Sequence, residues 1–412
     1  MNYEFFIAKR IIGSKSYKSS VSAPIIKIGI AAITIGIVVM LIAIATGLGL
    51  QKKVREKVVA FNGHITINEF NSNESNESIV PISVTQNFYP KFNNVDGVKH
   101  IQAVATKFGI VRTETDFEGI VLKGVGADYD WTYIQDFLVE GELPVYEGKL
   151  SNDVVISSYL ANRLGFKLND TFQVVFKKES IEDIPFQRRF KIVGIFNSGF
   201  QDIDKNFMIG DISHIQRMNK WESNEIGNFE VYLNDFTELS EIEQQIRNQT
   251  PSFLDTQTIE EKFDTTFEWI KIFDNNTYGI IAIMIIVAGI NMITALLVLI
   301  LERTQMIGIL KALGSSNWSI RKMFLYNATY LVCLGLFWGN LIGLGLLFAQ
   351  QKFGVLKFPD PEQYYVSIIP VHIGLDYIIL LNIGTFIACF LMLLIPSIII
   401  TKISPVKAIR FE

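Results

Sequence analysis

Four long runs without a charged side chain restrict the fold of this chain more than any other feature. They span residues 28–50, 275–301, 323–351 and 377–401, and none contains Asp, Glu, Lys, Arg or His. Each exceeds the roughly 20 residues that an α-helix needs to cross a hydrocarbon core about 30 Å thick. A core helix of a soluble protein would be shorter and would carry a polar face. We therefore predict four transmembrane helices.

The first run also has to be compared with a cleaved signal peptide. It begins only after 27 residues, and it is longer than the apolar region of a signal peptide, which spans roughly 7 to 15 residues. It lacks a convincing pair of small residues at the spacing of a cleavage site. We expect a retained membrane anchor.

The basic residues beside the four runs predict the orientation of the chain. Lys and Arg outnumber Asp and Glu by five to one in residues 1–27, by four to one in 302–322 and by three to one in 402–412. Short segments rich in Lys and Arg stay in the cytoplasm. We therefore expect both termini and the loop 302–322 to be cytoplasmic. Residues 51–274 and the loop 352–376 are then on the outer side.

The charge of the large outer segment differs from that of the inner segments. Residues 51–270 hold 22 basic and 34 acidic side chains, a net charge of −12, whereas the whole chain has a net charge of −4. Because the only basic surface is the one expected beside membrane spans, a role in nucleic-acid binding is excluded. The two cysteines, Cys333 and Cys389, both fall inside predicted spans, so the outer domain has no disulfide framework.

The outer segment has the pattern of a mixed domain. Alternating or β-branched runs predict strands, and helical periodicity favours helices at 158–165 and 238–249. The predicted strands are 64–68, 119–125, 153–157, 171–176, 189–196 and 229–235. Helical stalks are expected at both ends, over 50–61 and 258–273. The predicted fold class is a membrane α-helical protein with four transmembrane helices and a large α+β extracytoplasmic domain inserted between helices 1 and 2.

No catalytic motif is present in the sequence. There is no G-x-x-x-x-G-K-[ST] loop to hold a nucleotide, no H-E-x-x-H, and no Cys/His cluster with metal-ligand spacing. We therefore expect no enzyme activity, no catalytic residue and no metal site in this chain. Single amides inside the predicted spans are expected to form hydrogen bonds between helices; they are Asn291, Asn327, Asn340 and Asn382.

The loop 302–322 between the second and third spans is amphipathic. Met306, Ile309, Leu310 and Leu313 recur at helical spacing and predict one apolar stripe. Gly314 would end this helix, and Ser315 or Ser316 would begin the next. One interpretation is an interfacial helix that rests on lipid headgroups. The other is a helix that docks into a groove of a cytosolic partner. Because the chain has no nucleotide site, that partner would be an ATPase.

Three stretches carry a family resemblance. NMITALLVLILERTQMIGILKALGSSNWSIRKMF (291–324) resembles the signature of the FtsX/MacB/LolC superfamily of ABC transporter permeases. The tail SPVKAIRFE (404–412) and residues 139–176 resemble the same superfamily, the latter its MacB-like periplasmic core. The resemblance implies a coupling helix that docks on the ATP-binding subunit. The implied coupling residues are Met306, Ile307, Ile309, Leu310, Leu313 and Gly314.

Two further stretches are similar to the lipoprotein-releasing LolC/LolE branch, namely YYVSIIPVHI (364–373) and IEDIPFQRRFKIVGIF (181–196). In LolC-type subunits a hook at the second position engages the periplasmic carrier LolA. The resemblance assigns that hook to Ile184, Pro185, Phe186, Gln187 and Arg188. An ordinary β-hairpin tip remains the alternative.

The resemblance implies a permease subunit that extracts lipoproteins from the bacterial inner membrane and passes them to a LolA-like carrier. A separate LolD-like ATPase would bind ATP and Mg, and a second permease copy or a paralogue would complete the assembly. A lipid cavity would be lined by Ala43, Thr46, Leu48, Trp269 and Phe273, for which ordinary packing is the alternative. Two other functions stay open: a MacB-like exporter of another periplasmic substrate, and an FtsX-like mechanotransducer that regulates cell-wall hydrolases.

Overall fold

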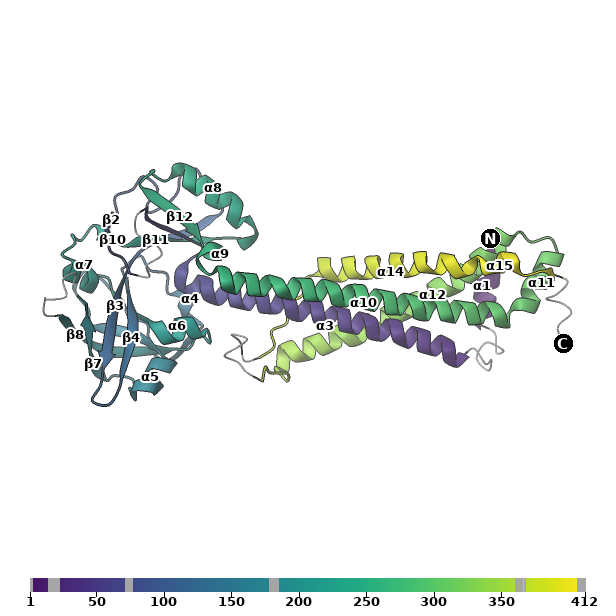
Figure 1. Ribbon diagram of the computed structural model, residues 1–412, viewed down its shortest axis with the longest axis horizontal. Helices are drawn as coiled ribbons and strands as arrows, with labels where there is room; N and C mark the ends of the chain where they lie inside the picture. Colours follow the sequence, from purple (N-terminus) through teal and green to yellow (C-terminus); the bar gives the residue numbers. More distant parts are fainter. Residues whose placement is uncertain are drawn as a thin grey trace. The chain divides into compact units, whose positions relative to one another are not determined.

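The computed structural model describes residues 3–13, 23–70, 77–177, 185–359, 366 and 368–405. The chain divides into two compact units (Figure 1). One, the helical unit, comprises Met1–Lys52, Trp269–Lys357 and Ile368–Glu412. The other, the sheet domain, comprises Lys53–Glu268 and Phe358–Ser367.

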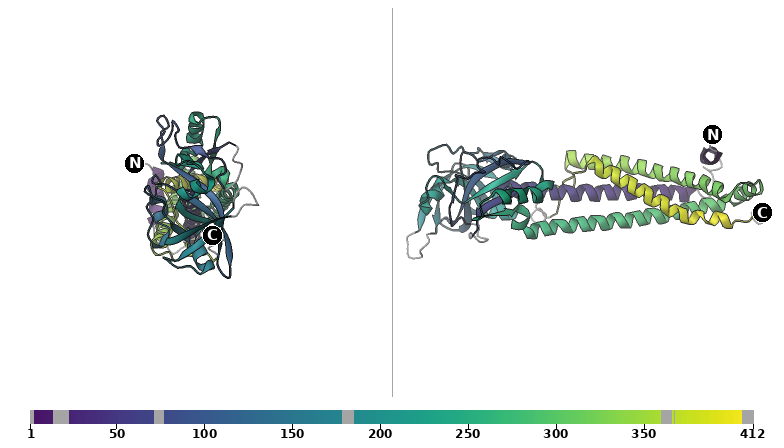
Figure 2. Two further views of the ribbon diagram at one scale, coloured as in Figure 1. Left: turned by 90° about the vertical axis from the view of Figure 1, so that its left-hand side faces the viewer. Right: turned by 90° about the horizontal axis from the view of Figure 1, so that it is seen from above.

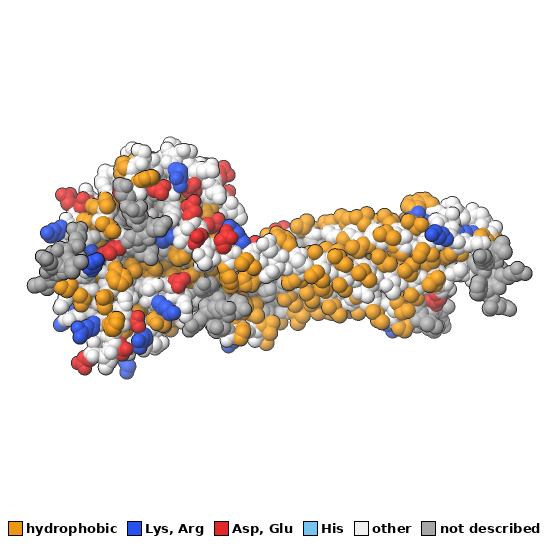
Figure 3. Space-filling view, in the orientation of Figure 1, with side chains coloured by type: hydrophobic (Ala, Val, Ile, Leu, Met, Phe, Trp, Pro, Cys, Tyr) orange, Lys and Arg blue, Asp and Glu red, His pale blue; other side chains and the backbone are white. Residues whose placement is uncertain are grey.

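Four helices are long and apolar enough to cross a membrane, which confirms the predicted four spans. They are α3 (Ala23–Asn62), α10 (Asp264–Glu302), α12 (Asn317–Phe353) and α14 (Leu375–Ser397). Their membrane segments run side by side (Figure 2). Apolar side chains cover the outer surface of these helices (Figure 3), and Ile283 and Leu380 are examples. Such a surface fits a hydrocarbon solvent and would be a liability in water.

A row of glycines brings α12 close to α3. The contacts pair Gly335 with Ile33, Gly339 with Ile37, and Gly343 with Leu41. A Cβ atom added at Gly339 would lie 2.6 Å from the Cβ atom of Ile37, so a larger residue does not fit without a shift of the helices. Because lipid supplies no hydrophobic driving force between helices, close packing through small residues is a main source of their association.

Polar contacts add to this packing. Asn340 of α12 and Asn382 of α14 exchange two side-chain hydrogen bonds, of 2.7 and 3.0 Å, as predicted for amides between helices. Asn291 and Asn327 instead donate to carbonyls four residues earlier in their own helices, so the prediction is wrong for these two. A side chain four residues from a carbonyl on the same helix reaches it more easily than one on a neighbouring helix.

The described part of the sheet domain contains a ten-stranded sheet in the order β12-β1-β11-β3-β4-β9-β6-β8-β5, with β7 paired to β3 and β8. The strands are β1 (Ile65–Glu69), β3 (Val98–Arg112), β4 (Phe117–Val125), β5 (Leu138–Gly141), β6 (Asp153–Ser157), β7 (Thr171–Phe176), β8 (Phe186–Phe196), β9 (Phe207–Asp211), β11 (Asn228–Leu233) and β12 (Leu254–Thr258). A separate two-stranded ladder joins β2 (Ile82–Ser83) and β10 (Glu225–Ile226).

Short helices connect the strands of this domain. They are α4 (Thr132–Gln135), α5 (Ser158–Leu164), α6 (Gln201–Asn206), α7 (Ser213–Asn219), the 3-10 helix η1 (Phe236–Glu238), α8 (Leu239–Gln249) and α9 (Ile259–Lys262). Gly165 ends α5 with a φ of 71°, as its position in the sequence predicts. The predicted α+β class is therefore confirmed.

The helix predicted over 258–273 is interrupted, so that prediction is wrong in detail. Phe263 leaves the helical region, with φ −118° and ψ 44°, and separates α9 from α10. Its ring lies 6.5 Å from that of Phe200, in the sheet domain. Thr258 and Glu261 form a capping box that begins α9, and α10 then begins at Asp264. An apolar contact of Phe263 therefore outweighs the helical periodicity of the segment.

The glycine row yields a prediction about stability. Gly339→Leu should lower the stability of the purified chain by about 1–3 kcal/mol, because the added side chain meets Ile37 of α3. Gly345→Leu is the matched control, since a Cβ atom there meets nothing within 4 Å. Thermal unfolding in detergent, followed by tryptophan fluorescence, measures both. Equal midpoints for the two variants would contradict the packing argument.

Candidate functional site

The loop between α10 and α12 forms a short helix, α11 (Thr304–Ala312). Gly314 follows it with a φ of 92°, and the amides of Gly314 and Ser315 donate to the carbonyls of Lys311 and Leu310, both at 3.0 Å. These two bonds define a Schellman motif, which ends the helix. The Ser316 hydroxyl accepts from the amide of Ser319 at 3.2 Å and begins α12. The predicted order of helix, glycine, serine and helix is therefore present.

The apolar residues of α11 point in different directions. Ile307 is fully buried in the apolar cluster of the helical unit, and Met306 and Leu310 pack partly against that cluster. Ile309 and Leu313 are 47% and 78% exposed. The single stripe predicted from the spacing is therefore divided, because Ile307, which lies outside that spacing, anchors the helix. The coupling role assigned to these residues stays a prediction.

Lys311 ties α11 to the end of the last membrane helix. Its ammonium donates to the carbonyls of Ile400 (2.7 Å) and Ile403 (2.8 Å), at the C-terminal end of α15 (Ile399–Lys402). The last carbonyls of a helix have no partner within the helix, and a cation there also complements the helix dipole. Arg321 of α12 donates to the Ser397 hydroxyl at 3.1 Å beside the same end. The loop is thus fixed to two membrane helices.

An N-terminal helix, α1 (Tyr3–Gly13), packs against α12 and is absent from the sequence prediction. The Ser319 hydroxyl donates to the Glu4 carboxylate at 2.8 Å, and the rings of Phe5 and Tyr326 meet edge to face at 5.9 Å. Residues 1–27 were interpreted only by their positive charge. The helical spacing of Phe5 and Ala8 was the available signal, and Ala8 is buried.

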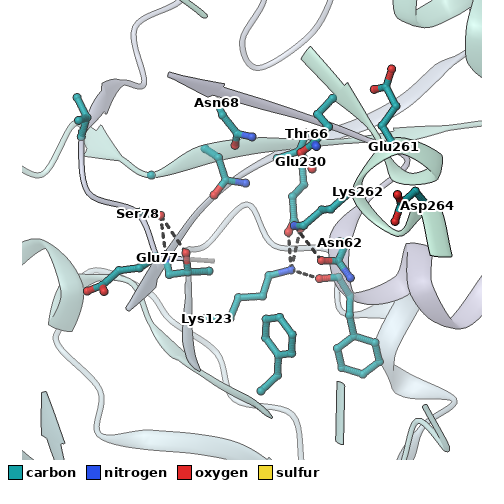
Figure 4. A pocket seen from close by; sticks show the side chains of 17 residues that line it. Asn62, Thr66, Asn68, Glu77, Ser78, Lys123, Glu230, Glu261, Lys262 and Asp264 are labelled. Atoms are coloured by element: carbon teal, nitrogen blue, oxygen red, sulfur yellow. Dashed lines mark hydrogen bonds and ion pairs between the residues drawn. The ribbon is translucent and has the colours of Figure 1, made fainter. Parts of the chain in front are cut away.

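In the sheet domain, a buried ion pair caps the end of α3. The Lys123 ammonium donates to the Phe61 carbonyl at 2.7 Å and lies 2.6 and 2.8 Å from the two carboxylate oxygens of Glu230 (Figure 4). Gln102 donates to Glu230 at 2.9 Å, and Tyr232 donates to the Ala60 carbonyl at 3.3 Å. Burial lowers the pKa of Lys123, and the charge of Glu230 opposes that shift.

The network lies beside a polar pocket of about 460 Å³. The pocket is lined by the end of α3, by β1, β4 and β11, and by α9 and the start of α10, as the labelled side chains in Figure 4 show. Lys262 donates to the Asn62 side chain at 3.1 Å, and burial lowers the pKa of Lys262 to about 8. The pocket therefore lies where the chain enters and leaves the sheet domain. Its two lysines stand among Glu230, Glu261 and Asp264, so its charge is mixed and favours no ion of one sign.

The predicted hook lies at the tip of the β7–β8 hairpin. Phe176 pairs with Phe186 and Val175 with Gln187, so the hook residues continue from the last rung of this ladder. Pro185 and Gln187 are exposed, and Phe186 and Arg188 are half-buried. Ile184 lies outside the described residues. The hairpin is compatible with either interpretation, and the carrier-binding role stays a prediction.

The predicted cavity residues all lie in the helical unit and are half-buried. Thr46 donates to the Ile42 carbonyl of its own helix at 2.8 Å, and Leu48 packs against the apolar cluster. The rings of Trp269 and Phe273 meet at 4.8 Å. Ala43 lies on α3 one turn from Thr46 and Gly47, where α3 approaches Thr277 of α10. The lipid-cavity role of the five residues stays a prediction.

Four membrane-length helices, an α+β domain between the first two and an amphipathic helix between the second and third define a membrane-spanning transport subunit. The sequence matches the MacB-like periplasmic core domain over residues 28–249 and the FtsX-like permease C-terminal over residues 278–405. The first match covers more than half of the chain, and the chain belongs to this family of permeases with a MacB-like core. It is a permease of the Lol type or of a related ABC type, and this family membership implies an ABC ATPase partner.

Similar proteins extend over nearly the whole chain. The lipoprotein-releasing system transmembrane protein LolC of Xylella fastidiosa (strain 9a5c) is 20% identical, with 98% of this chain and 96% of the relative covered. The corresponding protein LolE of Haemophilus influenzae is also 20% identical, with 99% of each chain covered. The periplasmic region of MacB from Actinobacillus actinomycetemcomitans matches 50% of this chain and 92% of its own length, with 15% identity and a TM-score of 0.34.

The ion pair at the end of α3 gives a second prediction. Lys123→Met should destabilise the chain by about 3–5 kcal/mol, because it leaves the Glu230 charge buried without a partner. The double variant Lys123→Met, Glu230→Met should recover part of that loss, since both charges are then removed. Lys53→Met is the control, because Lys53 forms an exposed pair with Glu56. Denaturant unfolding of the purified chain measures all three; a double variant no more stable than Lys123→Met would contradict the argument.

Proposed function

We propose that this chain is the permease subunit of an ABC transporter that extracts lipoproteins from the bacterial inner membrane and passes them to a periplasmic carrier. The observation that carries the proposal is the end-to-end similarity to LolC and LolE, which are lipoprotein-releasing proteins by name. The sheet domain would then be periplasmic, and both termini and α11 would be cytoplasmic. ATP and Mg would be bound by a separate, LolD-like subunit.

The energetics of a lipid anchor explain the need for such a device. Each buried CH₂ group of an acyl chain contributes about 0.8 kcal/mol to membrane binding, so an anchor of two or three chains is held by tens of kcal/mol. Release into water would cost most of that free energy. Transfer to a sheltered carrier avoids this cost, and ATP supplies the work of extraction.

The exposed side of α11 suits contact with an ATPase. Ile309 and Leu313 are large apolar side chains one helical turn apart and open to solvent. An amphipathic helix that presents such residues fits a groove on a partner. On the other side, Ile307 and Lys311 fix α11 to the membrane helices. A displacement of α11 would therefore move the helices with it.

The route to the sheet domain is a continuous helix. α3 includes the first membrane span and ends at Asn62, where Lys123 and Tyr232 of the sheet domain bond its last carbonyls. We propose that this helix carries the movement of the spans into the domain. The tip of the β7–β8 hairpin would bind the carrier, and the residues from Ala43 to Leu48, with Trp269 and Phe273, would contact the acyl chains. A second copy or a paralogue would complete the transporter.

The docking surface on α11 can be tested by co-purification. Leu313→Asp should lower the amount of ATPase that co-purifies with the tagged chain at least about tenfold, because a charge replaces an apolar contact. Val355→Asp is the matched control, since Val355 is equally exposed but lies in the loop after α12. Quantitative mass spectrometry gives the ratio of ATPase to permease. If both variants retain the ATPase as wild type does, α11 is not the docking helix.

The hook can be tested by cross-linking to a purified LolA-like carrier. A photoreactive amino acid at Gln187, near the hairpin tip, should cross-link the carrier strongly. The same amino acid at Lys191 should not, because Lys191 is exposed at the base of the same hairpin, where it pairs with Thr171. Denaturing gels report the adducts. Equal yields at the two positions would leave the tip as an ordinary hairpin.

A further inference from the structure

A second pocket, of about 480 Å³, lies between α1 and α11 in the helical unit. Its walls are apolar: α1 contributes Phe6 and Ile7, and α11 contributes Met306 and Leu310. Two arginines also line it, Arg10 of α1 and Arg303, the residue directly before α11. The pocket therefore combines apolar walls with two positive charges.

Arg303 is the unusual member of this pocket. Its Nε and Nη2 atoms are buried, and neither has a hydrogen-bond partner among the described residues. No described carboxylate lies within ion-pair distance of it either. A guanidinium stays charged at any accessible pH, and leaving it buried without a partner costs free energy. An anion from outside the described chain would satisfy it.

The position of Arg303 indicates where that anion comes from. The charge-free run of α10 ends at Leu301, two residues earlier, so Arg303 lies at the depth where the hydrocarbon core meets the headgroups. A free phosphate would have no use for the apolar walls. An amphiphile with a phosphate beside its acyl chains uses both, and basic pockets between membrane helices are known lipid headgroup sites.

We propose that this pocket binds an anionic phospholipid, whose phosphate is held by Arg303 and Arg10 and whose acyl chains lie along Phe6, Ile7, Met306 and Leu310. Guanidinium groups bind phosphate oxygens through paired, charge-assisted hydrogen bonds. The lipid would link α1 to α11 and so hold the short helix that carries Ile309 and Leu313. The site does not depend on which substrate the protein transports.

Native mass spectrometry of the purified full chain tests the site. The chain is released from nanodiscs of phosphatidylcholine with increasing phosphatidylglycerol, and retained phosphatidylglycerol is counted. Wild type should retain it, and Arg303→Gln should lower the apparent affinity about fivefold, the effect of one basic residue near a lipid surface. Lys322→Gln is the control, because Lys322 lies near the start of α12 but does not line the pocket. It should behave as wild type does.

Further arms separate the alternatives. Arg303→Lys, which keeps the charge, should retain the lipid, so that a loss in Arg303→Gln is not a loss of fold. Equal retention by wild type and Arg303→Gln overturns the proposal. Displacement of the lipid by an equal concentration of inorganic phosphate also overturns it, because the ligand is then a free anion. Loss of the lipid when the ATPase partner binds assigns the pocket to that protein and overturns it as well.

Discussion

The need to satisfy every backbone hydrogen bond inside a hydrocarbon layer governs the structure of this chain. In lipid, an unpaired amide or carbonyl costs several kcal/mol, so the spanning segments are uninterrupted helices. The same solvent removes the hydrophobic force that would bring helices together. Association then depends on close contact, which the glycines of α12 supply against α3, and on amide pairs such as Asn340 with Asn382.

The same requirement moves to the helix ends, where the last carbonyls lack partners. The structure meets it twice with a lysine. Lys311 bonds the carbonyls that end α15, and Lys123 bonds Phe61 at the end of α3. The exposed environment of Lys311 leaves its charge hydrated in part. Lys123 is only 1% exposed, and it therefore needs Glu230 as a counter-ion. A helix end that carries a load is thus bonded by a charged group of the element it must move.

The features predictable from the sequence are those that solvent imposes locally. The thickness of the bilayer fixes the length of the charge-free runs, and a half-buried sheet imposes the alternation seen in β7 and β8. The longest strand, β3, was missed because its polar residues are buried by partners far away in sequence. Gln102 bonds Glu230, and Lys107 bonds Asn219. No local pattern contains such partners. The buried network at the end of α3 was missed for the same reason.

The division of α11 follows from the same limit and gives the helix its meaning. Spacing alone identifies apolar positions but not their neighbours, and α11 has apolar residues on more than one side. Ile307 faces the membrane helices, Met306 and Leu310 line the pocket beside α1, and Ile309 and Leu313 face solvent. A helix that served only as an interfacial anchor would bury one face in lipid and leave the other polar. Exposed apolar residues opposite an anchored side are instead the geometry of a connector, which contacts the protein's own helices on one side and a partner on the other.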